Sequence, residues 1–202
     1  MSTLIQKKKV SSPAEHLLKH SPLKKGLKIK NEDLPLTDYS KITPKIYIGN
    51  IQAAQDTNFF KTKKIKAVLN CSNDIPNYFR DSDIEYLRIP IDDSLNAYDF
   101  NKMYHLLSIA AEFIHKHVDI LKNKIFIHCY AGRQRSISSC VAYFIKYNHM
   151  QLKQACKFIM EKRPEAFHFG KSFNFDQSLQ EFYNDTQNTP FKIRNPTFKS
   201  SR

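Results

Sequence analysis

The sequence contains no hydrophobic run long enough to span a membrane. Its N-terminus is polar and rich in lysine, unlike a secretory signal peptide. The four cysteines, at positions 71, 129, 140 and 156, lack the paired spacing of a zinc site. We therefore expect no transmembrane segment, no metal and no other cofactor. A chain that depends on a free thiol is expected in a reducing compartment, the cytoplasm or the nucleus.

Acidic residues are scarce, and the resulting positive charge is unevenly placed. There are 19 acidic against 32 basic residues, for a net charge of +13. Residues 1–30 carry +7 and residues 186–202 carry +4, which leaves +2 for residues 31–185. We expect residues 1–35 to be a mostly disordered basic extension, with a short helix over 13–20, and residues 186–202 to be a basic tail. Two interpretations of these ends are open: they are only solvated, or they bind RNA, DNA or acidic lipid.

Between these ends, short apolar segments typical of strands alternate with segments whose apolar residues recur at helical spacing. Strands are predicted near 45–48, 65–70, 84–91 and 124–128. Helices are predicted near 51–60, 100–117, 135–147 and 151–162, with Asp99 as the cap of the second. This alternation indicates an α/β fold with a central, largely parallel twisted sheet flanked by helices.

The most informative segment is residues 128–136, His-Cys-Tyr-Ala-Gly-Arg-Gln-Arg-Ser. A buried strand is predicted before it and a buried helix after it, so Cys129 lies on a tight turn at a helix N-terminus. Unpaired N–H groups and the helix dipole make such a turn an anion site. Gly132 permits unusual backbone angles, and Arg135 supplies a planar fork for a phosphate. The same positive field favours the Cys129 thiolate, which makes this residue a candidate nucleophile.

This segment resembles the Cys-x5-Arg-Ser/Thr signature of the cysteine-dependent protein tyrosine phosphatases. Other segments narrow the resemblance, over about residues 39–185, to the compact dual-specificity group. They are Ile42–Asn50, Ile65–Asn70, Ile89–Ser94, Arg163-Pro164, and the series Phe175, Leu179 and Phe182. The sequence departs from the usual pattern at Gln134, where many members have serine, and in a longer loop between Pro164 and Phe175.

The resemblance implies a role for each site residue. Cys129 would attack phosphorus, Arg135 would hold the phosphate, and Ser136 would donate a hydrogen bond to the sulfur. Asp93 would be the general acid, with Asp92 as its rival. His128 would be a buried ring that orients the loop. The phosphate-binding loop would consist of Tyr130, Ala131, Gly132, Arg133, Gln134 and Arg135.

The implied activity is metal-independent hydrolysis of phosphotyrosine, and of phosphoserine or phosphothreonine, in protein substrates. Arg133 and the basic ends keep a phosphoinositide phosphatase and an RNA 5′-triphosphatase open as alternatives. Two alternatives outside catalysis are a phosphate-binding pseudophosphatase scaffold and a nucleic-acid-binding protein. Cys71 follows a neighbouring strand, where it is either a small apolar filler or the disulfide partner of Cys129 under oxidation.

Overall fold

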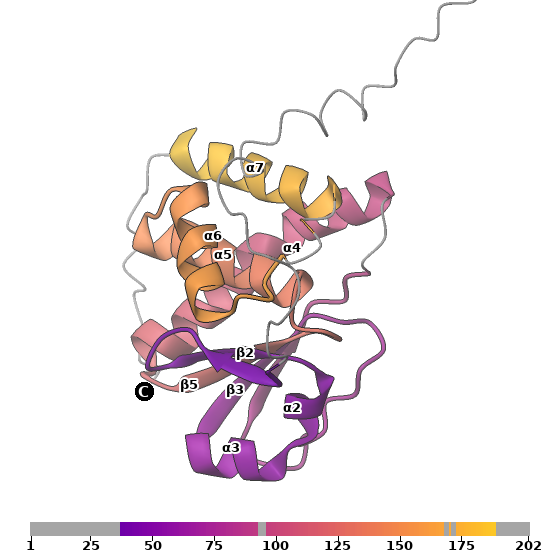
Figure 1. The fold of residues 1–202 in the computed structure, drawn as a ribbon, viewed down its shortest axis with the longest axis vertical. Helices are drawn as coiled ribbons and strands as arrows, with labels where there is room; N and C mark the ends of the chain where they lie inside the picture. Colours follow the sequence, from indigo (N-terminus) through magenta and orange to yellow (C-terminus); the bar gives the residue numbers. More distant parts are fainter. Residues whose placement is uncertain (1–36, 93–95, 168–169, 171–172, 189–202) are drawn as a thin grey trace, which may run out of the picture. The chain divides into compact units, whose positions relative to one another are not determined.

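The structure is a computed structural model that describes residues 37–92, 96–167, 170 and 173–188 (Figure 1). The expected N-terminal extension, with its helix over 13–20, lies outside the described residues. So do residues 189–202 of the expected tail and Asp93.

Five strands form one sheet, in the order β1-β2-β5-β3-β4. Their bounds are β1 (Tyr39–Lys41), β2 (Ile46–Gly49), β3 (Ile65–Asn70), β4 (Glu85–Arg88) and β5 (Lys124–His128). Strands β2, β5, β3 and β4 run parallel to one another, and the edge strand β1 pairs antiparallel with β2. The predicted α/β fold with a largely parallel sheet is therefore confirmed.

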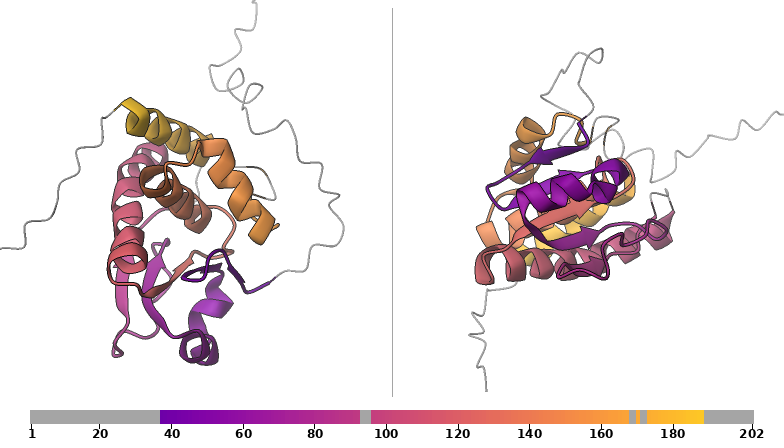
Figure 2. Two further views of the ribbon diagram at one scale, coloured as in Figure 1. Left: turned by 90° about the vertical axis from the view of Figure 1, so that its left-hand side faces the viewer. Right: turned by 90° about the horizontal axis from the view of Figure 1, so that it is seen from below.

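Helices cover both faces of the sheet (Figures 1 and 2). One face carries the two short helices α2 (Ile51–Gln55) and α3 (Thr57–Lys63). The other carries α4 (Ala97–His115), which continues into the π-helix η1 (Lys116–Ile120), together with α5 (Arg135–Asn148), α6 (Leu152–Lys162) and α7 (Phe173–Asn188). Because both faces are covered, the apolar residues of the central strand β5, Ile125, Phe126 and Ile127, are fully buried.

The sequence-based prediction of these helices was wrong at two points. The expected helix over 51–60 is two helices, because Asp56 adopts an extended conformation between them and its side chain accepts the Phe59 N–H at 3.0 Å. Asp99 is not a cap: α4 begins earlier, and Asn96 accepts the Asp99 N–H at 2.9 Å.

Two further elements were not among those predicted. Strand β1 has only three residues, too few for a periodic signal. Helix α7 buries Phe175, Leu179 and Phe182 at helical spacing, and it extends to Asn188, into the segment expected to be tail.

The fold places the carboxyl end of β5 in the middle of the sheet, directly before the N-terminus of α5. Open α/β sheets bind their ligands at the carboxyl ends of strands. Residues 129–134 form the connection at this point, so the predicted phosphate-binding loop occupies the expected ligand position.

Candidate active site

The loop between β5 and α5 is held by hydrogen bonds to its carbonyl groups from outside the loop. The donors are the N–H of Ile51 to Tyr130 at 3.0 Å, the Nε–H of Arg163 to Gly132 at 2.8 Å, and the N–H of Phe167 to Arg133 at 3.0 Å. In a trans peptide the next N–H points opposite to the carbonyl. Carbonyls tied outward therefore turn the N–H groups of residues 131, 133 and 134 inward, which creates a cradle for an anion.

Gly132 is required at its position for two reasons. Its φ is +66°, in the left-handed region that side chains rarely adopt. A Cβ there would lie 2.4 Å from the Gly49 carbonyl oxygen and 2.9 Å from Nη2 of Arg163. The loop therefore packs against β2 and Arg163 at a distance that only glycine permits.

Cys129 is buried, and its sulfur lies 3.4 Å from the Ser136 hydroxyl oxygen. Burial alone would raise the pKa of this thiol. The Arg135 guanidinium, the Ser136 hydroxyl and the backbone N–H groups of Ser136 and Gly132 outweigh burial and bring the pKa below its usual 9.0. The site therefore favours the thiolate.

The other cysteines provide a contrast. Burial raises the pKa of Cys71 to about 12, and it also raises the pKa of Cys140. The Cys71 sulfur lies 3.4 Å from the Ser139 hydroxyl oxygen. No disulfide links the four cysteines, all of which lie in the described part of the chain. Of these three thiols, only Cys129 lies in surroundings that favour ionisation.

Arg135 connects the loop to the segment expected to carry the general acid. Its Nη1 donates to the Ile91 carbonyl at 3.0 Å. Its Nε–H is buried, and among the described residues it has no hydrogen-bond acceptor. A buried donor of this kind is costly unless an acceptor binds there, so the geometry suits an anion in the loop.

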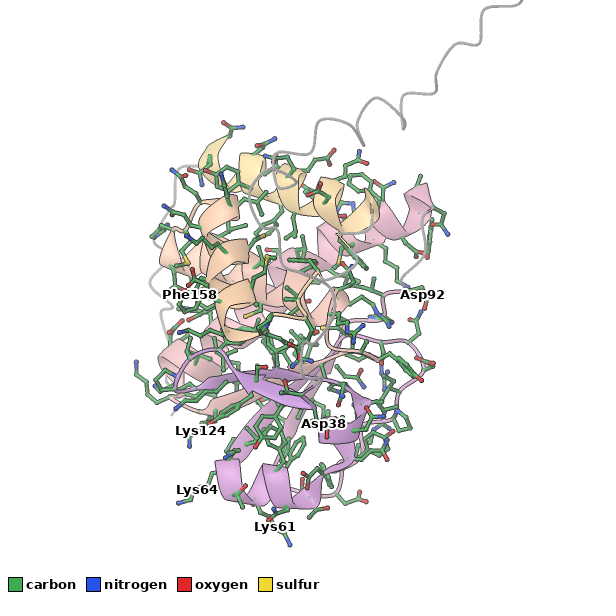
Figure 3. All side chains as sticks on the ribbon, in the orientation of Figure 1. Asp38, Lys61, Lys64, Asp92, Lys124 and Phe158 are labelled. Carbon is green, nitrogen blue, oxygen red and sulfur yellow. The ribbon has the colours of Figure 1, made fainter. Side chains whose placement is uncertain are left out.

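Of the two candidate acids, the structure describes only Asp92, which is exposed and lies at the edge of the domain as drawn (Figure 3). It directly follows Ile91, the residue that accepts from Arg135. The described geometry therefore brings Asp92 next to the site, and the choice between Asp92 and Asp93 as general acid stays a prediction.

His128 is buried, and its ring stacks on Phe126 with centroids 5.5 Å apart. Burial, aided by the charges of Arg88 and Arg135 and partly offset by a bond with the Cys129 backbone, lowers the pKa of His128 to about 4. The ring is therefore neutral at neutral pH. Its carbonyl accepts the Cys71 N–H at 2.7 Å, which ties the start of the loop to the segment after β3.

The remaining loop residues differ in exposure. Tyr130 is 63% exposed, and Ala131 is exposed beside it. Arg133 is partly buried, and the Gln134 side-chain amide donates to the Gly170 carbonyl. Gln134 therefore links the loop to the segment before α7, the region in which the sequence departs from the dual-specificity pattern.

Sequence reasoning missed one part of this site. Arg163 was used only as a point of resemblance, yet it is buried and bonds the loop directly. The signal that could have revealed it is the opposite charge of Glu165 two positions later, across Pro164 and before the apolar pair Ala166-Phe167. Within the described ranges, no three His, Cys, Asp or Glu side chains gather so as to hold a metal ion. None of the described helices is long and apolar enough to cross a membrane.

The family profile "Dual specificity phosphatase, catalytic domain" matches residues 46–185. The chain is 31% identical to dual specificity protein phosphatase 21 of Homo sapiens over 126 residues, which are 62% of this chain and 63% of that protein. It is also 31% identical to dual specificity protein phosphatase 18 of Rattus norvegicus over 129 residues, 64% of this chain and 60% of that protein. The chain thus spans about three fifths of the length of these relatives.

Solved structures show the same fold. Human DUSP28 superposes with a TM-score of 0.66 at 19% identity, covering 77% of this chain and 99% of that one. A mouse putative dual specificity phosphatase complexed with zinc tungstate gives a TM-score of 0.63 at 23% identity, covering 80% of this chain and 96% of that one. Since the matched catalytic domain takes up well over half of the 202 residues, the chain belongs to the dual specificity phosphatase family.

Proposed function

We propose that the protein is a phosphomonoester hydrolase that removes phosphate from phosphotyrosine, and from phosphoserine and phosphothreonine, of protein substrates. The observation that carries this proposal is the surroundings of Cys129: a thiol with a lowered pKa, at the base of a loop whose N–H groups face inward and whose Arg135 Nε–H has no described acceptor. A phosphate bound there has its phosphorus above the sulfur.

In the proposed first step the Cys129 thiolate attacks phosphorus in line with the leaving oxygen. The S–P bond forms as the P–O bond to the substrate breaks, and Asp93 gives its proton to the leaving oxygen. Arg135 and the N–H groups of the loop stabilise the negative charge on the three remaining phosphate oxygens.

In the second step water attacks the phosphocysteine, and the Asp93 carboxylate accepts a proton from that water. The S–P bond breaks, inorganic phosphate leaves, and the thiolate is restored. The Ser136 hydroxyl, 3.4 Å from the sulfur, can donate to it as negative charge returns. The chain supplies every group that these two steps use, which supports a route without metal or cofactor.

The names of the relatives support a protein substrate over a phosphoinositide, a 5′-triphosphorylated RNA or a pseudophosphatase role. Tyr130, 63% exposed in the loop, provides an aromatic surface for a phosphorylated side chain. Because the proposed route depends on a reduced thiol, we place the protein in a reducing compartment, the cytoplasm or the nucleus.

The test is hydrolysis of p-nitrophenyl phosphate in the presence of a metal chelator. We expect turnover by the wild type, no turnover by Cys129→Ser, and near-normal turnover by the matched control Cys140→Ser, whose thiol has a raised pKa. Rapid acid quench and mass spectrometry should detect phosphate on Cys129. Activity that persists in Cys129→Ser would refute the nucleophile. A panel of phosphotyrosine and phosphothreonine peptides, phosphoinositides and 5′-triphosphorylated RNA then ranks the substrates.

A further inference from the structure

Arg163 is an unusual residue for the interior of a protein. It ends helix α6, and only 1% of its surface is exposed. Burying a guanidinium is costly unless its charge is paired and its N–H groups are bonded. The contacts of Arg163 must therefore account for its burial.

Those contacts join three separate segments of the chain. The Nε–H donates to the Gly132 carbonyl of the phosphate-binding loop at 2.8 Å. Nη1 lies 3.1 Å from the carboxylate of Glu165, which is itself 4% exposed, and donates to the Ser40 hydroxyl at 3.1 Å. Both terminal nitrogens also reach the Thr37 carbonyl at 3.4 Å, and the Thr37 hydroxyl donates to Glu165 at 3.0 Å.

We propose that Arg163 is a positioning residue for phosphoryl transfer, which holds the peptide between Gly132 and Arg133 with its carbonyl outward and its N–H toward the phosphate. Glu165 and Thr37 in turn hold the guanidinium in place. This inference rests on the proposed function and deepens it, because it assigns a support to the loop that binds the transferred phosphate.

The geometry of the loop favours this role over simple filling of space. The Gly132 carbonyl and the Arg133 N–H belong to one planar peptide, so a donor that fixes the first also aims the second. Gly132 lacks a side chain to restrain its backbone, and a Cβ at this position would lie only 2.9 Å from Nη2 of Arg163. Burial lowers the pKa of Arg163, while the negative charges of Glu165 and of the Cys129 thiolate oppose that effect. The guanidinium is thus electrostatically coupled to the nucleophile as well as bonded to its loop.

The experiment removes both charges together, because removing one alone leaves the other buried and unpaired. The variant is Arg163→Met combined with Glu165→Gln, and the matched control is Lys157→Met with Glu161→Gln, an exposed ion pair on the same helix. Four quantities are measured on the full chain: the thermal unfolding midpoint, kcat and KM for p-nitrophenyl phosphate, the affinity for tungstate, and the pH midpoint of Cys129 alkylation by iodoacetate.

We expect the double variant to unfold near the wild-type temperature. Its kcat/KM should fall roughly 10- to 100-fold, its tungstate affinity about tenfold or more, and its alkylation midpoint should move to higher pH. The control should match the wild type in all four. A folded double variant with wild-type kcat/KM, tungstate affinity and alkylation midpoint would overturn the proposal.

A second variant decides the matter if the double variant does not fold. Arg163→Lys keeps a positive charge beside Glu165 but lacks the planar guanidinium. It should therefore show the same changes in kcat/KM, tungstate affinity and alkylation midpoint, with smaller magnitude. Wild-type values of all three in a folded Arg163→Lys would overturn the proposal. If the wild type itself hydrolyses no phosphate ester, the proposed function fails. Tungstate affinity and alkylation still test whether Arg163 positions the loop.

Discussion

Asp92 and Asp93 are adjacent carboxylates, and only one of them can be the general acid. We expect Asp93→Ala to slow hydrolysis of poor leaving groups, such as phenyl phosphate, about 100-fold or more, because those groups need a proton as they depart. Good leaving groups should be affected much less. Asp92→Ala should show no such dependence, since Asp92 is exposed and serves as the neighbouring control. Rates compared across a series of aryl phosphates measure the effect. A leaving-group dependence seen in Asp92→Ala instead would move the role to that residue.

His128 makes stability depend on pH. The folded protein keeps its ring neutral down to a pKa of about 4, whereas the unfolded chain takes up a proton near 6.5. Between these values the unfolded state binds more protons, so the free energy of unfolding falls as the pH falls. The difference corresponds to about 3 kcal/mol, present in full above pH 6.5 and lost by about pH 4.

His128→Phe keeps a ring on Phe126 but cannot bind a proton. We expect its free energy of unfolding, measured by urea titration at several pH values, to fall less steeply than that of the wild type between pH 7 and pH 4. The exposed His105 provides the control, because His105→Phe should leave the slope unchanged. Equal slopes in the wild type and in His128→Phe would show that another group governs acid sensitivity.

At the scale of elements, Asp56 decides where two helices meet. Its backbone ends α2, and its carboxylate caps α3 by accepting the Phe59 N–H at 3.0 Å. We expect Asp56→Ala to lower the free energy of unfolding by about 1 kcal/mol, because an N-terminal donor of α3 loses its acceptor. Asp83→Ala, at an exposed turn, should change it by no more than about 0.5 kcal/mol. Urea titration measures the free energy of unfolding of both variants. Equal losses in the two would show that the Asp56 cap does not stabilise α3.

The same element shows what periodicity can and cannot predict. The apolar runs that became β2, β3 and β5 were found because buried parallel strands are continuous and β-branched. The break at Asp56 was missed because Asp56 both interrupts and restarts a helix, and the hydrophobic pattern runs through it. Strand β1 gave no signal of its own, because three residues are too few to show a period. Its pairing with β2 depends on the turn between them.

At the scale of the whole molecule, local sequence predicted the loop but not its supports. Cys129, Gly132, Arg135 and Ser136 lie within eight residues, so their meeting follows from one turn and one helix. The contact of Arg163 with Thr37 joins residues 126 positions apart, and no local pattern contains it. That these four residues meet was therefore predictable from the sequence, whereas the network that holds their loop required the fold.

Charge is also a property of the whole chain, and here it is concentrated at the ends. Residues 1–30 carry +7 and residues 186–202 carry +4, against +2 between them. If the ends bind RNA or acidic lipid, replacing their lysines and arginines with glutamine in the 202-residue chain should weaken binding strongly. The loss should be measurable as a fall in the salt dependence of affinity, because each neutralised phosphate contact removes about 0.7 from the slope for single strands.

Hydrolysis of p-nitrophenyl phosphate should be unchanged in this glutamine variant, since the proposed phosphate-binding loop, residues 130–135, lies outside both ends. Replacing the same lysines with arginine is the matched control, because it keeps the charge and should keep the binding. Single-stranded RNA and vesicles containing phosphatidylserine are compared as separate ligands at the same salt concentration, so that their affinities identify which polyanion the ends prefer. If neither ligand binds the wild type at about 0.15 M salt, where exposed charges more than roughly 8 Å apart are largely screened, the charged ends serve only to keep the chain solvated.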